Sequence, residues 1–170
     1  EANTEPYLKT PVWKHAKHRV IWLLVLMISA SITGAIISKY EAAFAAVPLL
    51  VSFIPMIMDT GGNCGSQSST LIIRGLAVDE LHFADALSIL WKELRVALLV
   101  GLALAAVESG VIMIRYNDPA LAAVVSLSLM CTVACAKVTG GLLPIAAKRL
   151  GLDPALMAAP LITTVVDTVA

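Results

Sequence analysis

The stretch VIWLLVLMISASITGAIIS, residues 20–38, carries no charged side chain and has the length needed to cross a bilayer, about 20 apolar residues. The rest of the chain has the same character: 59% of the 170 residues are hydrophobic and only 14% are charged, against about 25% in a soluble domain. The composition predicts an all-α, polytopic membrane protein. A formal net charge of zero argues against a basic nucleic-acid-binding surface.

Outward from this run, alternating apolar segments and turns predict five transmembrane helices. Residues 1–19 form a cytoplasmic, interfacial segment, and residues 79–95 are amphipathic, which predicts an interfacial helix ahead of the third span. Asp118 is a typical helix N-cap and Gly151 a typical helix end. The predicted spans are, in order, residues 20–38, 42–77, 94–115, 119–150 and 154–170, the last of which stops with the sequence and is expected to be truncated.

Two of these spans contain residues that interrupt helices. Proline removes a backbone donor, and glycine weakens a helix interior. We therefore predict broken or kinked second and fourth spans, which is a pattern that transporters use at ion sites. The residues responsible are Pro48, Pro55, Gly61, Gly62 and Gly65 in the second span, and Gly140, Gly141 and Pro144 in the fourth.

Basic residues indicate the orientation, because lysine and arginine concentrate on the cytoplasmic side of a membrane protein. With a cytoplasmic N-terminus, only Lys39 and Arg115 fall outside. The predicted location is therefore the cell membrane, as a multi-pass protein. The residues that then fall on the cytoplasmic side are Lys9, Lys14, Lys17, Arg19, Arg74, Lys92, Arg95, Lys148 and Arg149.

Four ionisable side chains lie inside predicted spans: Asp59, Glu108, Lys137 and Asp167. A charge at the bilayer centre costs about 2.5–3.5 kcal/mol on insertion scales, so such residues usually face a bundle interior or a water-filled path. We interpret Lys137 as a counter-charge to Asp59 or Asp167, and Glu108 as a structural or rim charge. No nucleophile, base and orienting residue converge in the sequence, so we expect no enzyme.

Oxygen donors accompany two of these acids. Asp59, Asn63 and Gln67 are spaced by four and share one helical face, beside Gly62. A second set follows, in which Thr163 lies one turn before Asp167, with Thr164 as its neighbour. Oxygen ligands without nearby His or Cys favour hard cations such as Mg²⁺, Mn²⁺ or Ca²⁺. Cys131 and Cys135 are interpreted as packing residues, with a soft-metal site as the alternative.

These residues resemble a known family. The runs PMIMDTGGNCGSQSSTLIIRGLA, residues 55–77, and PLITTVVDT, residues 160–168, are similar to the second and fifth spans of MgtE-type magnesium transporters, which are related to animal solute-carrier magnesium transporters. The resemblance covers nearly the whole chain from about residue 8. It implies that residues 20–170 form the family's transmembrane domain, and we expect no N or CBS regulatory domain in this chain.

The resemblance also implies a homodimer with the ion path at the dimer interface. Asp167 would face a largely hydrated Mg²⁺, Thr163 would contribute its carbonyl, and Asn63 would line the path. Asp59 and Lys137 depart from the family pattern, since each stands where a small residue is expected.

Three functions remain open from the sequence. The leading one is a channel-like Mg²⁺ transporter, the second a Na⁺- or H⁺-coupled Mg²⁺ exchanger, and the third a membrane scaffold that transports nothing. The first predicts flux driven by the Mg²⁺ gradient alone, and the second predicts flux that depends on another ion.

Overall fold

All regular secondary structure is helical in the computed structural model, which describes residues 11–151, 164–166 and 168. The predicted all-α class is confirmed for these residues. In chain order the elements are α1 (Val12–Lys39), α2 (Glu41–Ala46), the 3-10 helix η2 (Pro48–Phe53), α3 (Ile54–Ala77), the 3-10 helix η3 (Phe83–Asp85), α4 (Ala86–Tyr116) and α5 (Pro119–Arg149).

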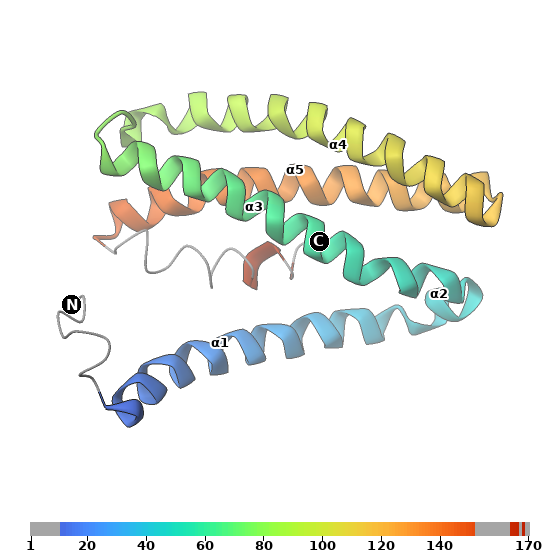
Figure 1. Ribbon diagram of the computed structural model, residues 1–170, viewed down its shortest axis with the longest axis horizontal. Coiled ribbons are helices and arrows are strands. Elements are labelled where there is room, and N and C mark those ends of the chain that lie inside the picture. The colour runs from blue at the N-terminus through green and yellow to red at the C-terminus, as the bar shows by residue number, and fades with distance from the viewer. Residues whose placement is uncertain (1–10, 152–163, 167, 169–170) are drawn as a thin grey trace.

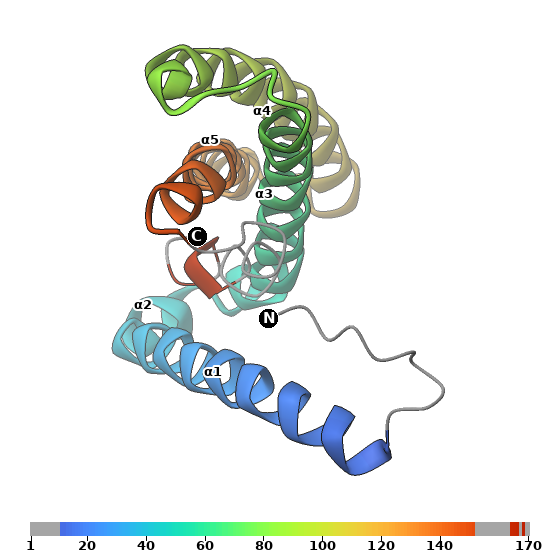
Figure 2. The same cartoon turned by 90° about the vertical axis from the view of Figure 1, so that its left-hand side faces the viewer.

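Helix α5 packs along both α3 and α4, and these three helices form a bundle (Figures 1 and 2). Helix α1 lies on the far side of the bundle from α4 and is joined to α3 through α2 and η2 (Figure 2). The short helical piece that contains Thr164 and Val166 lies between them. The Ser29 hydroxyl of α1 donates to the Thr164 carbonyl at 3.4 Å, while Val166 packs into the bundle core.

The bundle core consists of small and branched side chains at three levels. Cys64, Ala97, Val133 and Ala136 lie at the centre with Leu129 and Val166. Phe53, Ile112, Leu121, Ala122 and Val125 pack at the end near α2, and Ile72, Leu76, Ile89 and Ile145 pack at the opposite end. Small residues at the centre let the helix backbones approach closely, as is typical of membrane helices.

The closest approach is between α3 and α5. A Cβ added at Gly140 would overlap the carbonyl group of Gly65, so only glycine fits there. A Cβ added at Gly141 would lie 3.1 Å from Cγ of Glu93 on α4. These two glycines therefore serve helix packing. The fourth span, predicted to be broken or kinked, has no break, because α5 continues as one α-helix through the buried Pro144.

The predicted ends of α5 are confirmed. The Asp118 carboxylate accepts hydrogen bonds from the backbone N–H groups of Ala120 and Leu121, both at 3.0 Å. Gly151 follows the helix with φ of +71°, a conformation that glycine adopts without strain. Both features depend on neighbouring residues only, which is why the sequence was sufficient to predict them.

The second predicted span is broken, as expected, but the break lies early. Residues 41–53 form α2 and η2, and Pro55 lies in the first turn of α3, where its missing N–H costs nothing. Gly61 and Gly62 lie within an uninterrupted helix. The break therefore comes from the turn around Pro48.

Within residues 79–95, where an interfacial helix is predicted ahead of the third span, the α-helix begins only at residue 86 and is continuous with that span. Helix α4 begins at Ala86 and runs without interruption to Tyr116. Its first turns are amphipathic because one side packs on the bundle, where Ile89 and Glu93 are buried, and the polar side faces outward.

Three helical segments of the described residues have the length and composition to cross a membrane: Val12–Lys39, Phe83–Tyr116 and Pro119–Arg149. Helix α3 is absent from this set because its polar residues lower its hydropathy. Most of the predicted fifth span lies outside the described residues. Large apolar side chains cover the exterior of α1 and α4, including Leu99 at 70% and Ile114 at 87% exposure, as expected of a surface that faces lipid.

Candidate functional site

A groove that contains Asp59 and Asn63 runs along the outer face of α3. It is open, has a volume of about 480 Å³, and begins at Pro55 in the first turn of the helix. Its lining residues are Ile54, Pro55, Met58, Asp59, Gly62, Asn63 and Ser66. A Cβ added at Gly62 would meet nothing within 4 Å, so the groove is open at this glycine. The predicted alignment of Asp59, Gly62 and Asn63 on one side of α3 is therefore present.

Asp59 and Asn63 are joined directly. The Asn63 side-chain N–H donates to the Asp59 carboxylate at 3.2 Å, and both side chains are exposed. This bond leaves the Asn63 amide oxygen and the second carboxylate oxygen free to bind a ligand. Gln67, one turn further along, is also exposed. The face thus presents several neutral oxygens and one carboxylate along α3.

Only part of the second predicted set lies within the described residues. Thr163 and Asp167 fall outside them. The Thr164 hydroxyl is buried and has no hydrogen-bond partner among the described residues. Its carbonyl oxygen accepts bonds from Ser29 and from Thr168. Thr164 is thus the member of this set whose side chain the structure describes.

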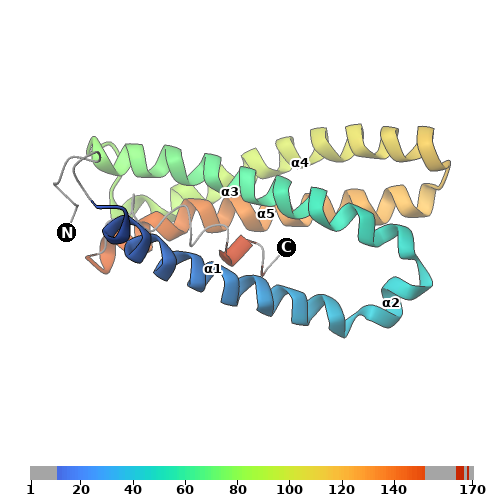
Figure 3. The ribbon, with the colours of Figure 1, turned by 60° about the horizontal axis from the view of Figure 1, so that its bottom comes forward.

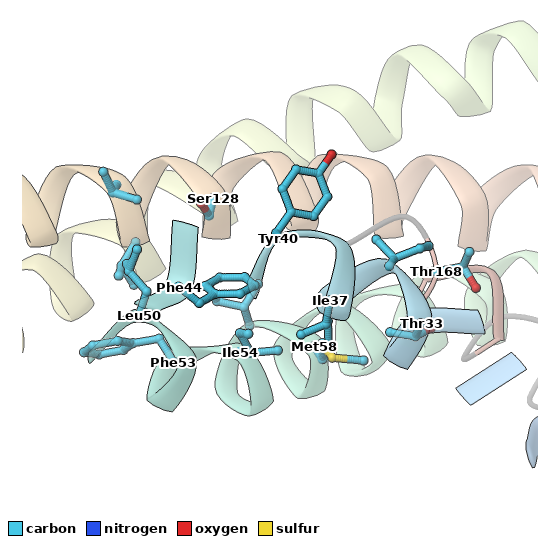
Figure 4. Close-up of a pocket in the computed structure, with 14 residues that line it drawn as sticks. Thr33, Ile37, Tyr40, Phe44, Leu50, Phe53, Ile54, Met58, Ser128 and Thr168 are labelled. Atoms are coloured by element: carbon cyan, nitrogen blue, oxygen red, sulfur yellow. The ribbon is translucent and has the colours of Figure 1, made fainter. Parts of the chain in front are cut away.

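An apolar cavity lies beside this segment, between α1, α3 and α5 (Figure 4). Its volume is about 330 Å³, and Tyr40, Phe44 and Phe53 are among the residues that line it. Thr33, Ser128 and Thr168 supply its polar groups. None of the described residues that line the cavity carries a charge.

Lys137 lies away from the groove. Its side chain is 5% exposed, and its ammonium donates to the Ser68 hydroxyl at 3.2 Å. The Ser68 hydroxyl in turn donates to the Glu93 carboxylate at 2.6 Å. Within the described part of the chain, Lys137 forms no ion pair with Asp59, and Asp167 lies outside that part. The charge that lies near Lys137 is Glu93, which was not among the predicted site residues.

Glu93 and Ser68 were missed for a reason visible in the sequence. Glu93 lies on the buried stripe of α4, one turn before Ala97, and Gly101 and Ala105 continue this stripe at intervals of four. Small residues repeated at this spacing mark the packed face of a membrane helix. A glutamate at the same spacing of four lies on that packed face and is therefore buried. Assigning residues 79–95 to the membrane surface hid this register.

Among the described residues, no three His, Cys, Asp or Glu side chains gather into a metal cluster. Cys131 and Cys135 are exposed on α5, and Glu108 is half-buried on α4. The carboxylate of the groove thus stands among neutral donors, in an arrangement that suits an ion which keeps most of its water.

Comparison with known proteins agrees with this chemistry. Residues 54–170 match a family described as "MgtE: Divalent cation transporter". The chain is 40% identical over 151 residues to the magnesium transporter MgtE of Thermus thermophilus, covering 88% of this chain and 33% of that protein. It is 33% identical over 158 residues to the magnesium transporter MgtE of Bacillus subtilis, covering 93% and 35% respectively.

The chain spans about a third of the length of these relatives. The family match covers most of the chain and includes the groove on α3. On this ground, and with its apolar helices and oxygen-lined face, the chain belongs to the MgtE family of divalent cation transporters.

Proposed function

We propose that this chain carries Mg²⁺ across the cell membrane through a channel-like, oxygen-lined path on the polar face of α3. Asp59 and Asn63 are the ion-facing groups of α3, with Gln67 and Gly62 lining the path. Thr163, Thr164 and Asp167 contribute further oxygens to the path. The observation that carries the proposal is the hydrogen-bonded Asp59–Asn63 pair, exposed in the groove of a membrane protein.

The donor set favours Mg²⁺ as the substrate, and Mn²⁺ or Ca²⁺ as weaker ones. Mg²⁺ loses its waters reluctantly and is usually held through one or two carboxylates and its own hydration shell. Helix α3 has 24 residues, about 36 Å at 1.5 Å per residue, which exceeds the thickness of the hydrocarbon layer. Helix α3 is then polar because it lines the path.

A second copy of the chain covers the groove. Asp59 and Asn63 are exposed, and leaving them against lipid would cost several kcal/mol. A homodimer in which the two α3 faces meet places these groups in a shared, hydrated path. Ser66→Cys, on the groove, should then form a disulfide-linked dimer in a background that lacks the native cysteines. Leu99→Cys, on the lipid face of α4, should not. Equal cross-linking of both variants would overturn this interface.

Mg²⁺ flux into proteoliposomes tests the function. Asp167→Asn is compared with the unmodified protein, with Na⁺ and H⁺ gradients switched on and off. Flux that is lost in Asp167→Asn and indifferent to the second gradient supports the channel. A requirement for that gradient would establish a coupled exchanger instead. The absence of Mg²⁺ flux under every gradient would favour the scaffold.

A further inference from the structure

Three polar side chains meet inside the bundle, one from each helix. Ser68 of α3, Glu93 of α4 and Lys137 of α5 are 1%, 8% and 5% exposed. Ser68 lies between the other two, since it accepts a hydrogen bond from Lys137 and donates one to Glu93. The three helices are thus joined through a single hydroxyl.

The two hydrogen bonds place Ser68 between an acidic and a basic side chain. The Ser68 hydroxyl donates to the Glu93 carboxylate at 2.6 Å. The remaining lone pairs of this hydroxyl face the Lys137 ammonium at 3.2 Å. Ser68 therefore bridges a cation and an anion, and the cluster is neutral as a whole.

This cluster is separate from the ion path. Ser68 follows Asp59 by nine positions, about two and a half turns at 3.6 residues per turn, and so lies on the opposite face of α3. The bundle interior contains the cluster, and the groove lies outside it. Glu93 therefore has no direct contact with the Asp59–Asn63 pair, and its carboxylate needs a positive charge of its own.

Removing the ammonium would leave a buried carboxylate beside a free hydroxyl. An unpaired carboxylate is unfavourable at this depth unless a cation or a proton replaces the lost charge. The Glu93 and Ser68 oxygens lie at hydrogen-bonding distance from each other, and the space left by the lysine side chain is beside them. Together they provide room and oxygen ligands for a small hard cation.

We propose that Lys137 is a built-in counter-ion that occupies a monovalent-cation site formed by Glu93 and Ser68. The tethered ammonium makes the fold independent of Na⁺, and its removal turns the cluster into a Na⁺ site. As a consequence, Mg²⁺ transport does not require a co-transported ion. Only this statement about transport rests on the proposed function.

The thermal stability of the purified full chain in detergent tests the proposal without any transport. Lys137→Ala should be less stable than the unmodified protein in N-methylglucamine chloride. Its Tm should rise by about 3–5 °C when Na⁺ exceeds its dissociation constant roughly tenfold. The unmodified protein, Lys92→Ala on the exposed side of α4, and the double variant Glu93→Gln/Lys137→Ala should not respond to Na⁺. Equal Tm values of Lys137→Ala in the two salts would overturn the proposal.

Lys137→Gln is the second variant, to be used if the alanine variant does not fold. It keeps a donor for Ser68 but has no charge, so the same response to Na⁺ is expected. Stabilisation by acid in place of Na⁺ would show that Glu93 takes a proton, and would also overturn the proposal. Mg²⁺ flux, measured with equal Na⁺ on both sides, should require Na⁺ only in the Lys137 variants. If the unmodified protein shows no Mg²⁺ flux, the proposed function fails. The stability measurement would still decide whether Lys137 occupies a cation site.

Discussion

At the scale of single residues, Asp59 is the only carboxylate among the described residues of the groove. Asp59→Asn retains the shape of the side chain and removes its charge. We expect Mg²⁺ flux to fall about tenfold, which corresponds to about 1.4 kcal/mol in the barrier. The matched control is Asp79→Asn, since Asp79 is exposed outside the groove and has φ of +62°, which asparagine tolerates. Equal flux in both variants would remove Asp59 from the path.

Thr164 allows function to be separated from stability. Its hydroxyl is buried without a partner among the described residues, so Thr164→Val should leave Tm unchanged or raise it. Mg²⁺ flux should nevertheless fall, because the path loses an oxygen. Thr164→Ser keeps the hydroxyl and should retain flux. A valine variant that transports at the normal rate would show that this hydroxyl has no part in the path.

The sequence was sufficient to predict the Asp59–Asn63 alignment but not the Lys137–Ser68–Glu93 cluster. The first depends on two positions of one helix that are four residues apart, so helical periodicity places the two side chains together. The second joins three helices, and Ser68 and Lys137 are 69 positions apart. Periodicity shows that Glu93 shares a face with Ala97. Which helix covers that face is decided by packing.

At the scale of elements, the contact of α3 with α5 depends on Gly140. Gly140→Ala would place a methyl group against the Gly65 carbonyl, and this backbone cannot move aside without separating the helices. We expect a loss of about 1–3 kcal/mol in the free energy of unfolding. Gly110→Ala on α4 is the control, because its Cβ meets nothing within 4 Å, and it should be neutral or stabilising by up to about 1 kcal/mol.

Thermal unfolding in detergent measures both variants. Equal Tm values for Gly140→Ala and Gly110→Ala would contradict the close approach of α3 and α5. The same reasoning explains why the fourth span is not broken as predicted. Its glycines were interpreted as helix breakers, whereas they are the positions at which α3 and α4 touch α5.

At the scale of the whole molecule, the start of α1, the turn between α3 and α4, and the end of α5 lie at one end (Figure 3). Lys148 donates to the Leu76 carbonyl at 3.1 Å, and Arg149 lies 4.6 Å from the Phe83 ring centre at this end. The predicted cytoplasmic groups that the structure describes and the predicted external residues Lys39 and Arg115 thus lie at opposite ends of the fold.

The orientation can be tested by labelling intact cells with a membrane-impermeant thiol reagent, in a background without native cysteines. Lys39→Cys should be labelled and Lys92→Cys should not, because basic residues favour the cytoplasmic side. Both should be labelled after the membrane is permeabilised. The reverse pattern in intact cells would place the N-terminus outside.

The attachment of α1 through Ser29 has a consequence for how the protein is made. Only about 6% of the membrane-crossing window of α1 is buried, and its hydrogen-bond partner Thr164 lies 135 positions later. A ribosome that adds about 5–20 residues per second needs about 7–27 s to synthesise that distance. Meanwhile α3, α4 and α5, which follow one another closely, have already been made. A chain truncated before residue 164 and released from the ribosome should therefore hold an assembled bundle beside an undocked α1.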